Sequence, residues 1–213
     1  MAQVVVIDYG MGNLRSVAKA VEHVAPELSV IISSDADEIA SAERVIFPGQ
    51  GAARDCMREL QDRDLTQVVL TAATEKPFLG ICMGMQILLD HSEENNGIDC
   101  LGLYAGNVRY FGNDLKSSAG EKLKIPHMGW NEVNQKSDHP LWQNIKNQAR
   151  FYFVHSYYMD PQDESLVVAS SDYGMEFTTA IAKDNVFAVQ FHPEKSAQDG
   201  LQLLKNFTQW NGK

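Results

Sequence analysis

Short apolar runs that are each followed by a segment with helical spacing constrain the fold of this chain more than any other feature. The runs are VVVID at residues 4–8, LSVII at 28–32, RVIFPG at 44–49 and FLGI at 78–81, with helical patterns over 13–25, 52–61 and 65–73. Buried strands that alternate with helices form parallel sheets covered on both faces. The sequence therefore predicts an α/β fold in which ligands bind at the loops that follow the strands.

The pattern changes after about Gly106, where strand candidates follow one another closely. They are NVRYF, FYFVHSYYM, LVVASS, FTTAIAK and VFAVQF, and an amphipathic segment over 197–210 comes last. These strands predict an antiparallel addition to the parallel sheet. Because no repeat and no low-complexity linker divides the 213 residues, we expect a single domain over residues 1–213.

Composition narrows the class of partner. The formal net charge of −10 argues against binding of nucleic acid or of an anionic membrane surface. The first residues lack the features of a secretory signal, and no run of 18 apolar residues occurs, so we expect a cytoplasmic protein. The three cysteines are widely spaced and predict neither a disulfide framework nor a CxxC metal site.

The glycines after the first strand, in DYGMGNLRS, do not form a dinucleotide-binding fingerprint. In GxGxxG spacing from Gly10 and Gly12, the third glycine would fall at Arg15. The stretch is better explained as a strand-to-helix turn with Asn13 as the helix N-cap.

The stretch LGICMGMQ places Cys82 between an apolar strand and a segment with helical spacing. Gly80-x-Cys82-x-Gly84 is the thiol counterpart of the G-x-S-x-G nucleophile elbow, in which small neighbours permit a tight turn. Backbone N–H groups at a helix N-terminus would stabilise the thiolate. The alternative is that Cys82 is a small buried core residue, as free cysteines often are.

The best candidate for a base lies far downstream, in QFHPE. His192 and Glu194 are two residues apart, and an extended backbone at the intervening Pro193 would place both side chains on one side. Cys82, His192 and Glu194 then have the logic of a catalytic triad. H-x-E also occurs in zinc deaminases, but their P-C-x-x-C motif would have to follow and no cysteine follows Cys100, so no metal is expected.

Other polar stretches are less specific. PGQG at residues 48–51 supplies a glycine-rich turn whose N–H groups could bind an oxyanion, although an ordinary loop would have the same sequence. His23, His91 and His139 have polar neighbours that suggest surface positions, and no role is assigned to them.

The combination of PGQG, GICMGMQ and QFHPE, in this order and at these distances, resembles the triad-type, class I glutamine amidotransferases. The opening VVVIDYGMGNLRSV, SEENNG, PHMGWN and FYFVHSYY narrow the resemblance to the glutaminase subunits of imidazole glycerol phosphate synthases, over effectively the full length. It implies the class I amidotransferase fold, a mostly parallel sheet flanked by helices with added antiparallel strands. It implies no cofactor.

The resemblance also implies roles for individual residues. Cys82 would attack the carboxamide of L-glutamine to form a γ-glutamyl thioester, His192 would carry the proton to departing ammonia, and Glu194 would orient His192. The backbone N–H groups near Gln50, Gly51 and Met83 would bind the oxyanion. Glutamine would be held by Gly51, Gln86, Glu94, Tyr152, Ser156 and Tyr157, although Gln86 and Glu94 could instead be solvated helix surface.

By the same resemblance, the ammonia passes to a (βα)8 cyclase partner in a heterodimer, which makes imidazole glycerol phosphate and an aminoimidazole carboxamide ribotide in histidine biosynthesis. The residues that match the partner interface are Asn13, His127, Met128, Trp130 and Asn131. Trp130 could equally be a core residue, given the area that tryptophan buries.

Three alternatives stay open at this stage. Gln50 stands where the family more often has a small aliphatic residue, which leaves room for a paralogue that feeds a sugar-modifying synthase. The glutaminase subunit of pyridoxal phosphate synthase shares the size and the triad, although PHMGWN and YGMGN speak against it. A catalytically idle regulatory subunit would keep the fold but not a reactive Cys82.

Overall fold

The computed structural model describes residues 3–117 and 119–213. Its main sheet begins with five neighbouring strands that are all parallel, in the order β2-β1-β3-β4-β14. Their bounds are β1 (Gln3–Ile7), β2 (Ser29–Ser33), β3 (Arg44–Gly49), β4 (Phe78–Cys82) and β14 (Val186–Val189). Nearly continuous apolar sequence suits these strands, because helices cover both faces of the sheet.

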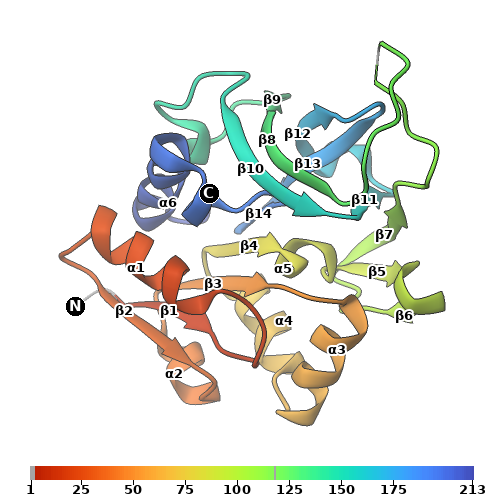
Figure 1. The fold of residues 1–213 in the computed structure, drawn as a ribbon. Helices are drawn as coiled ribbons and strands as arrows, with labels where there is room; N and C mark the ends of the chain where they lie inside the picture. The colour runs from red at the N-terminus through yellow and green to blue at the C-terminus, as the bar shows by residue number, and fades with distance from the viewer. Residues whose placement is uncertain (1–2, 118) are drawn as a thin grey trace.

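Two groups of helices cover the parallel strands. Helix α1 (Leu14–Val24) packs against α6 (Ala197–Gln209). On the other face lie α3 (Ala53–Asp62) and α4 (Thr66–Glu75), with α2 (Ala36–Ser41) packed against α4 (Figure 1). The buried positions of α1, Val17, Ala18 and Val21, recur at helical spacing and form the stripe that faces the core.

The second half of the chain extends the sheet beyond β14, mostly with antiparallel strands. The order continues β13-β11-β7-β5-β6, and β12 pairs with both β13 and β9. A separate two-stranded sheet joins β8 to β10. The bounds are β5 (Leu89–Ser92), β6 (Ile98–Asp99), β7 (Tyr104–Tyr110), β8 (His127–Glu132), β9 (Asn134–Gln135), β10 (Arg150–His155), β11 (Tyr157–Pro161), β12 (Val167–Asp172) and β13 (Glu176–Lys183).

The fold class predicted from the sequence is confirmed: a mostly parallel central sheet flanked by helices, with additional antiparallel strands. Some details differ from the predictions, and two of them concern the strands of the second half of the chain. The run FYFVHSYYM is not one strand, because the chain leaves β10 for the main sheet at Ser156. VFAVQF is antiparallel to β13 but parallel to β4, so it closes the parallel part rather than belonging only to the antiparallel addition.

Candidate active site

Cys82 is the last residue of β4 and lies at the junction with α5 (Met83–Gln86). Its φ is 56° and its ψ is −111°, a conformation that side chains with a Cβ rarely adopt. The turn is closely packed: a Cβ on Gly84 would lie 1.8 Å from the carbonyl oxygen of Phe47, and one on Gly80 would lie 2.7 Å from the carbonyl oxygen of Gly84. The two glycines are therefore required sterically, as the elbow interpretation predicts.

Helix α5 is shorter than the helical spacing of MGMQILL predicted. It makes a single turn of 4 residues, and the chain enters β5 at Leu89. Ile87 and Leu88 are fully buried, so their apolar character reflects the core rather than a longer helix. The macrodipole of one turn is small, which leaves any stabilisation of a thiolate to individual hydrogen-bond donors.

His192 and Glu194 meet as the sequence predicted, but by a different backbone route. His192 is extended, with φ −102° and ψ 98°, whereas Glu194 belongs to a 3-10 helix over Pro193–Lys195. The Nδ1 of His192 lies 2.9 Å from Oε1 of Glu194, and both side chains are almost completely buried. The backbone N–H of His192 donates to the carbonyl oxygen of Tyr152 at 2.9 Å, which fixes the ring's attachment point.

The charge state of His192 follows from its neighbours. Burial lowers the pKa of His192, but the adjacent Cys82 and Glu194 outweigh burial and raise the pKa to about 9. Within the described residues, Nε2 of His192 has no hydrogen-bond partner. Hydrogen bonds between catalytic groups are often long in active sites without substrate and shorten when substrate binds.

Cys82 and His192 line the same pocket, which has a volume of about 440 Å³. It is lined by Gln50, Gly51, Cys82, Met83, Gln86, Glu94, Pro126, Val154, His155, Ser156, Tyr157 and His192. Every predicted glutamine-binding residue except Tyr152 is in this set. Tyr152 lies on β10 outside this set, and its ring packs edge-on against that of Trp130 on the neighbouring strand β8.

The pocket presents both donors and acceptors. Gln86 is buried rather than solvated, and its Nε2 donates to the carbonyl oxygen of Tyr157 at 2.9 Å. An oxygen of Glu94 accepts from the backbone N–H of Ala53 at 2.6 Å. Burial raises the pKa of Glu94, and the hydrogen bond from Ala53 offsets part of that effect.

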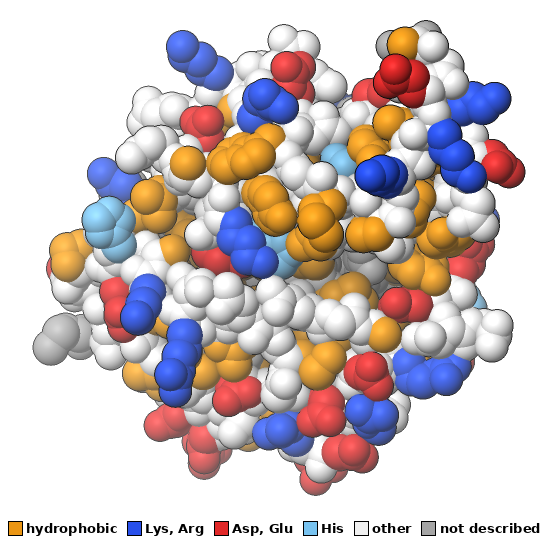
Figure 2. Space-filling view, viewed as in Figure 1, with side chains coloured by type: hydrophobic (Ala, Val, Ile, Leu, Met, Phe, Trp, Pro, Cys, Tyr) orange, Lys and Arg blue, Asp and Glu red, His pale blue; other side chains and the backbone are white. Residues whose placement is uncertain are grey.

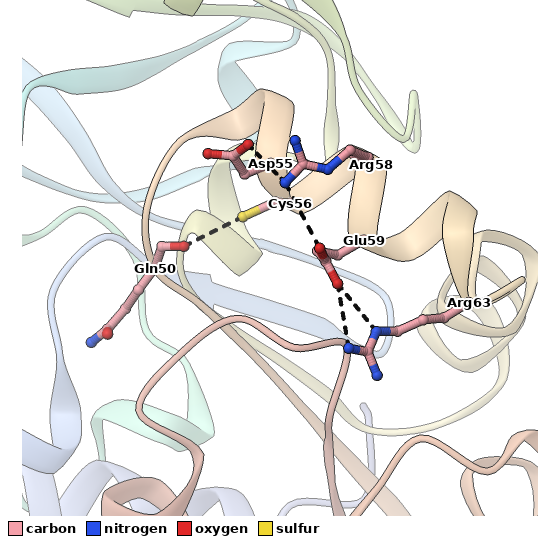
Figure 3. Close-up of polar contacts among 6 residues, drawn as sticks. All are labelled: Gln50, Asp55, Cys56, Arg58, Glu59 and Arg63. Carbon is pink, nitrogen blue, oxygen red and sulfur yellow. Dashed lines mark hydrogen bonds and ion pairs between the residues drawn. The ribbon is translucent and has the colours of Figure 1, made fainter.

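The Gln50–Gly51 turn is tied to α3 by a buried thiol. The Cys56 thiol donates to the carbonyl oxygen of Gln50 at 3.6 Å and accepts from the hydroxyl of Tyr9, also at 3.6 Å. Figure 3 shows the Cys56 side chain directed at Gln50, on the helix that also carries the ion pairs of Glu59 with Arg63 and of Asp55 with Arg58. Burial raises the pKa of Cys56 to about 12, so its thiol remains a donor at neutral pH.

The predicted interface residues divide into outward and inward groups. Met128 is 61% exposed and Trp130 is 44% exposed, so Trp130 is not a core residue. Hydrophobic side chains gather over β8 and β10 on the face seen in Figure 2. Asn13 and Asn131 are partly exposed, whereas His127 is 3% exposed and its Nδ1 lies 2.9 Å from Nε2 of His155.

Some expectations about single residues are corrected by the structure. Asn13 occupies the N-cap of α1 but makes no side-chain capping bond within the described part of the chain. His139 is partly rather than fully exposed: its ring packs against Phe187 and Trp210, and its Nδ1 accepts from the N–H of Leu141. Burial lowers the pKa of His139 to about 4.

Sequence reasoning missed several functional-site residues. Pro126, Val154 and His155 line the pocket, and Gln190 lies beneath it against Cys82. Pro126 and Val154 are apolar and carry no signal of their own. Gln190 stands two residues before His192, so the same alternation that paired His192 with Glu194 could have found it.

Residues 3–117 and 119–213 contain no group of three His, Cys, Asp or Glu side chains arranged to hold a metal ion. In the same residues, no helix has the length and apolar character needed to cross a membrane.

Comparisons with known proteins agree with this geometry. A family model described as glutamine amidotransferase class-I matches residues 5–210. The imidazole glycerol phosphate synthase subunit HisH of Dechloromonas aromatica is 59% identical over 208 residues, covering 97% of this chain and 96% of that protein. The subunit of the same name from Pseudomonas putida is 57% identical over 213 residues, covering 100% of both.

Two solved structures share the fold at low sequence identity. A protein described as glutamine amidotransferase has a TM-score of 0.69 and 15% identity, with 96% of this chain and 97% of that chain covered. The structure of PurLQS from Thermotoga maritima contains a chain with a TM-score of 0.63 and 18% identity, with 97% of both chains covered.

Proposed function

The chain belongs to the class-I glutamine amidotransferase family, and we propose that it hydrolyses L-glutamine to glutamate and ammonia as the glutaminase subunit of an imidazole glycerol phosphate synthase. One observation carries the proposal: Cys82, in a positive-φ turn, shares a pocket with His192, whose other ring nitrogen contacts Glu194. A nucleophile, a base and a group that orients the base are the parts that acyl transfer through cysteine requires.

In the first half of the reaction, the Cys82 thiolate attacks the side-chain carbonyl carbon of glutamine and a C–S bond forms. The carbonyl oxygen becomes an oxyanion, for which backbone N–H groups of Gln50, Gly51 and Met83 are the donors at the pocket wall. As the intermediate collapses, the C–N bond breaks and the protonated His192 gives its Nε2 proton to the leaving nitrogen. Ammonia departs and a γ-glutamyl thioester remains.

In the second half, His192 is neutral and takes a proton from a water molecule as that water attacks the thioester. The new C–O bond forms, the C–S bond breaks, and glutamate leaves with the Cys82 thiolate restored. Glu194 contacts Nδ1 throughout and favours the imidazolium that forms in this step.

Substrate binding follows from the donors and acceptors of the pocket. The carboxylate of Glu94 suits the α-ammonium group of glutamine. Gln86 uses its Nε2 for bonds within the protein, which leaves its Oε1 to accept from the substrate. Gly51, Ser156 and Tyr157 complete the lining. Tyr152 is not part of the pocket lining, and its ring packs against Trp130.

The ammonia passes to a (βα)8 cyclase partner, which uses it to make imidazole glycerol phosphate and an aminoimidazole carboxamide ribotide in histidine biosynthesis. The cyclase docks on the face that presents Asn13, Met128, Trp130 and Asn131, and Trp130 is its aromatic anchor. His127 supports β8 from the inside. The chain acts as one domain over residues 1–213 in the cytoplasm, a compartment that suits its free cysteines.

Glutamate release from L-glutamine tests the proposal, measured for the chain alone and for its complex with a cyclase partner in the presence of the cyclase's ribonucleotide substrate. We expect strong stimulation by the partner and its ligand, and no release from the Cys82→Ala complex. If the wild-type chain binds the partner but releases no glutamate, the chain is a catalytically idle subunit. If it neither binds the partner nor releases glutamate, a different synthase receives the ammonia.

A further inference from the structure

Gln190 is a fully buried amide that lies against the nucleophile. It follows β14 directly and its exposed fraction is 0%. Its Nε2 lies 3.7 Å from Sγ of Cys82, and its Oε1 accepts from Nε2 of Gln86 at 2.7 Å. Its backbone N–H donates to the carbonyl oxygen of Thr179 at 2.8 Å, which ties the residue to β13. Every polar end of this side chain is therefore engaged.

The donor and acceptor ends of Gln86 and Gln190 can be assigned because one partner, a backbone carbonyl group, can only accept hydrogen bonds. The backbone carbonyl of Tyr157 only accepts, so Gln86 must present its NH₂ group to it. The second hydrogen of that NH₂ group then points at Gln190, which must accept it with its side-chain carbonyl oxygen. The NH₂ group of Gln190 is left facing Cys82. The orientation of both amides is thus fixed by the backbone.

We propose that Gln190 donates a hydrogen bond to Sγ of Cys82 and thereby stabilises the thiolate that attacks glutamine. The inference rests on the proposed function only in taking Cys82 as the nucleophile. A donor aimed at a sulfur favours the ionised form, because a thiolate accepts hydrogen bonds far better than a thiol does. The effect is strengthened by burial, where water does not compete for the sulfur.

Of the groups around Cys82, Gln190 and His192 are the ones placed to stabilise its thiolate. Helix α5 contributes the dipole of one turn only. The thiol of Cys56 is committed to the carbonyl oxygen of Gln50. His192 must release its Nε2 proton to the leaving nitrogen, whereas the amide of Gln190 keeps its protons throughout. Gln190 is therefore the donor that remains on the sulfur in every state of the reaction.

The test is the rate at which iodoacetamide alkylates Cys82 in the full chain, followed by peptide mass spectrometry over a range of pH. This readout requires no turnover of glutamine, so its failure is distinguishable from failure of the proposed function. In Gln190→Met, which keeps the side-chain length but removes the donor, alkylation near neutral pH should slow by about tenfold, and the difference should close at alkaline pH, where the thiol ionises in either protein. In Gln190→Glu, a carboxylate would face the sulfur and alkylation should be slower still.

Thr179→Val is the matched control. Thr179 is buried beside Gln190, and its hydroxyl has no partner within residues 3–117 and 119–213. The valine variant changes a neighbouring buried polar group without touching the amide chain, and it should alkylate at the wild-type rate. Wild-type alkylation in a folded Gln190→Met variant at neutral pH would overturn the proposal.

A measurement on the unaltered side chain covers the case in which the Gln190 variants do not fold. The side-chain amide NMR signal of Gln190 in the wild-type chain should shift with pH in step with the alkylation of Cys82, and it should not shift in this way in Cys82→Ala. A signal that ignores the ionisation of Cys82 would show that the amide does not bond to the sulfur.

Discussion

The backbone of Cys82 allows a stability prediction with an unusual sign. A residue that has a Cβ and is held at φ 56° and ψ −111° stores about 1–3 kcal/mol of strain, whereas glycine adopts positive φ at little cost. Replacing Cys82 with alanine keeps the Cβ and the strain, and replacing it with glycine removes both. The comparison between the two variants therefore isolates the backbone term.

The magnitude follows from three contributions. At an ordinary buried position alanine is favoured over glycine, because glycine loses about 0.5–1 kcal/mol more conformational entropy on folding and lacks a methyl group worth about 0.8 kcal/mol. The sum is about 1.5 kcal/mol. Subtracting about 2 kcal/mol of strain reverses the sign, so the free energy of unfolding of Cys82→Gly should exceed that of Cys82→Ala by about 0.5 kcal/mol.

Urea unfolding of the two variants, neither of which should turn over glutamine, measures this difference directly. Cys56 supplies the matched pair, because it is fully buried in the interior of α3 and is not among the residues with positive φ. There we expect Cys56→Ala to be more stable than Cys56→Gly by about 1.5 kcal/mol. The same preference for alanine at both positions would refute the strain at Cys82.

Three further predictions concern the packing, the buried histidines and the partner surface. Gly84→Ala should lower the free energy of unfolding by about 3 kcal/mol or more, because the new Cβ would lie 1.8 Å from the backbone oxygen of Phe47, which cannot move aside. A urea midpoint near that of wild type would show that alanine fits at this position. Burial lowers the pKa of His127 to about 4, and burial together with the neighbouring His127 lowers the pKa of His155 to about 3. Below the ordinary histidine pKa of 6.5, the unfolded chain therefore binds more protons than the folded chain does. The free energy of unfolding should fall as the pH drops from about 6.5 towards 4, by up to about 1.4 kcal/mol per pH unit for each ring. A urea midpoint that stays constant over that range would exclude this linkage. Trp130→Ala should leave the free energy of unfolding in urea within about 1 kcal/mol of wild type. It should weaken cyclase binding in titration calorimetry by about 2 kcal/mol or more, and unchanged binding would show that Trp130 is not part of the interface.

The parts of the fold that the sequence predicted are those set by local pattern. The runs that became β1, β3 and β4 are apolar almost throughout, and each is closed by a turn or a helix within a few residues, so neighbouring residues decide the outcome. The strand β8 was not recognised in PHMGWN, because its partner β10 lies about twenty residues away and its outer face keeps Met128 and Trp130 exposed. A half-exposed strand with apolar residues on its outer side lacks the usual alternation.

The site was predictable where its residues meet through short backbone segments. His192 and Glu194 are two positions apart and Cys82 lies within its own turn, so the His192–Glu194 contact and the tight turn at Cys82 could be predicted from spacing. Val154, His155 and Ser156 line the pocket where the chain passes from β10 to β11 in the other sheet, whereas Tyr152, earlier on β10, does not. Such outcomes depend on which strands pair, and pairing is set by tertiary packing rather than by local sequence.

The account depends most directly on a covalent bond between Cys82 and the substrate. The decisive measurement is mass spectrometry of the complex with its cyclase partner, quenched in acid during turnover of L-glutamine. We predict one added γ-glutamyl group, located on the peptide that contains Cys82 and absent from the Cys82→Ala complex, which should release no glutamate. Glutamate release that continues in the Cys82→Ala complex, or a glutamyl group found on another residue, would contradict the mechanism.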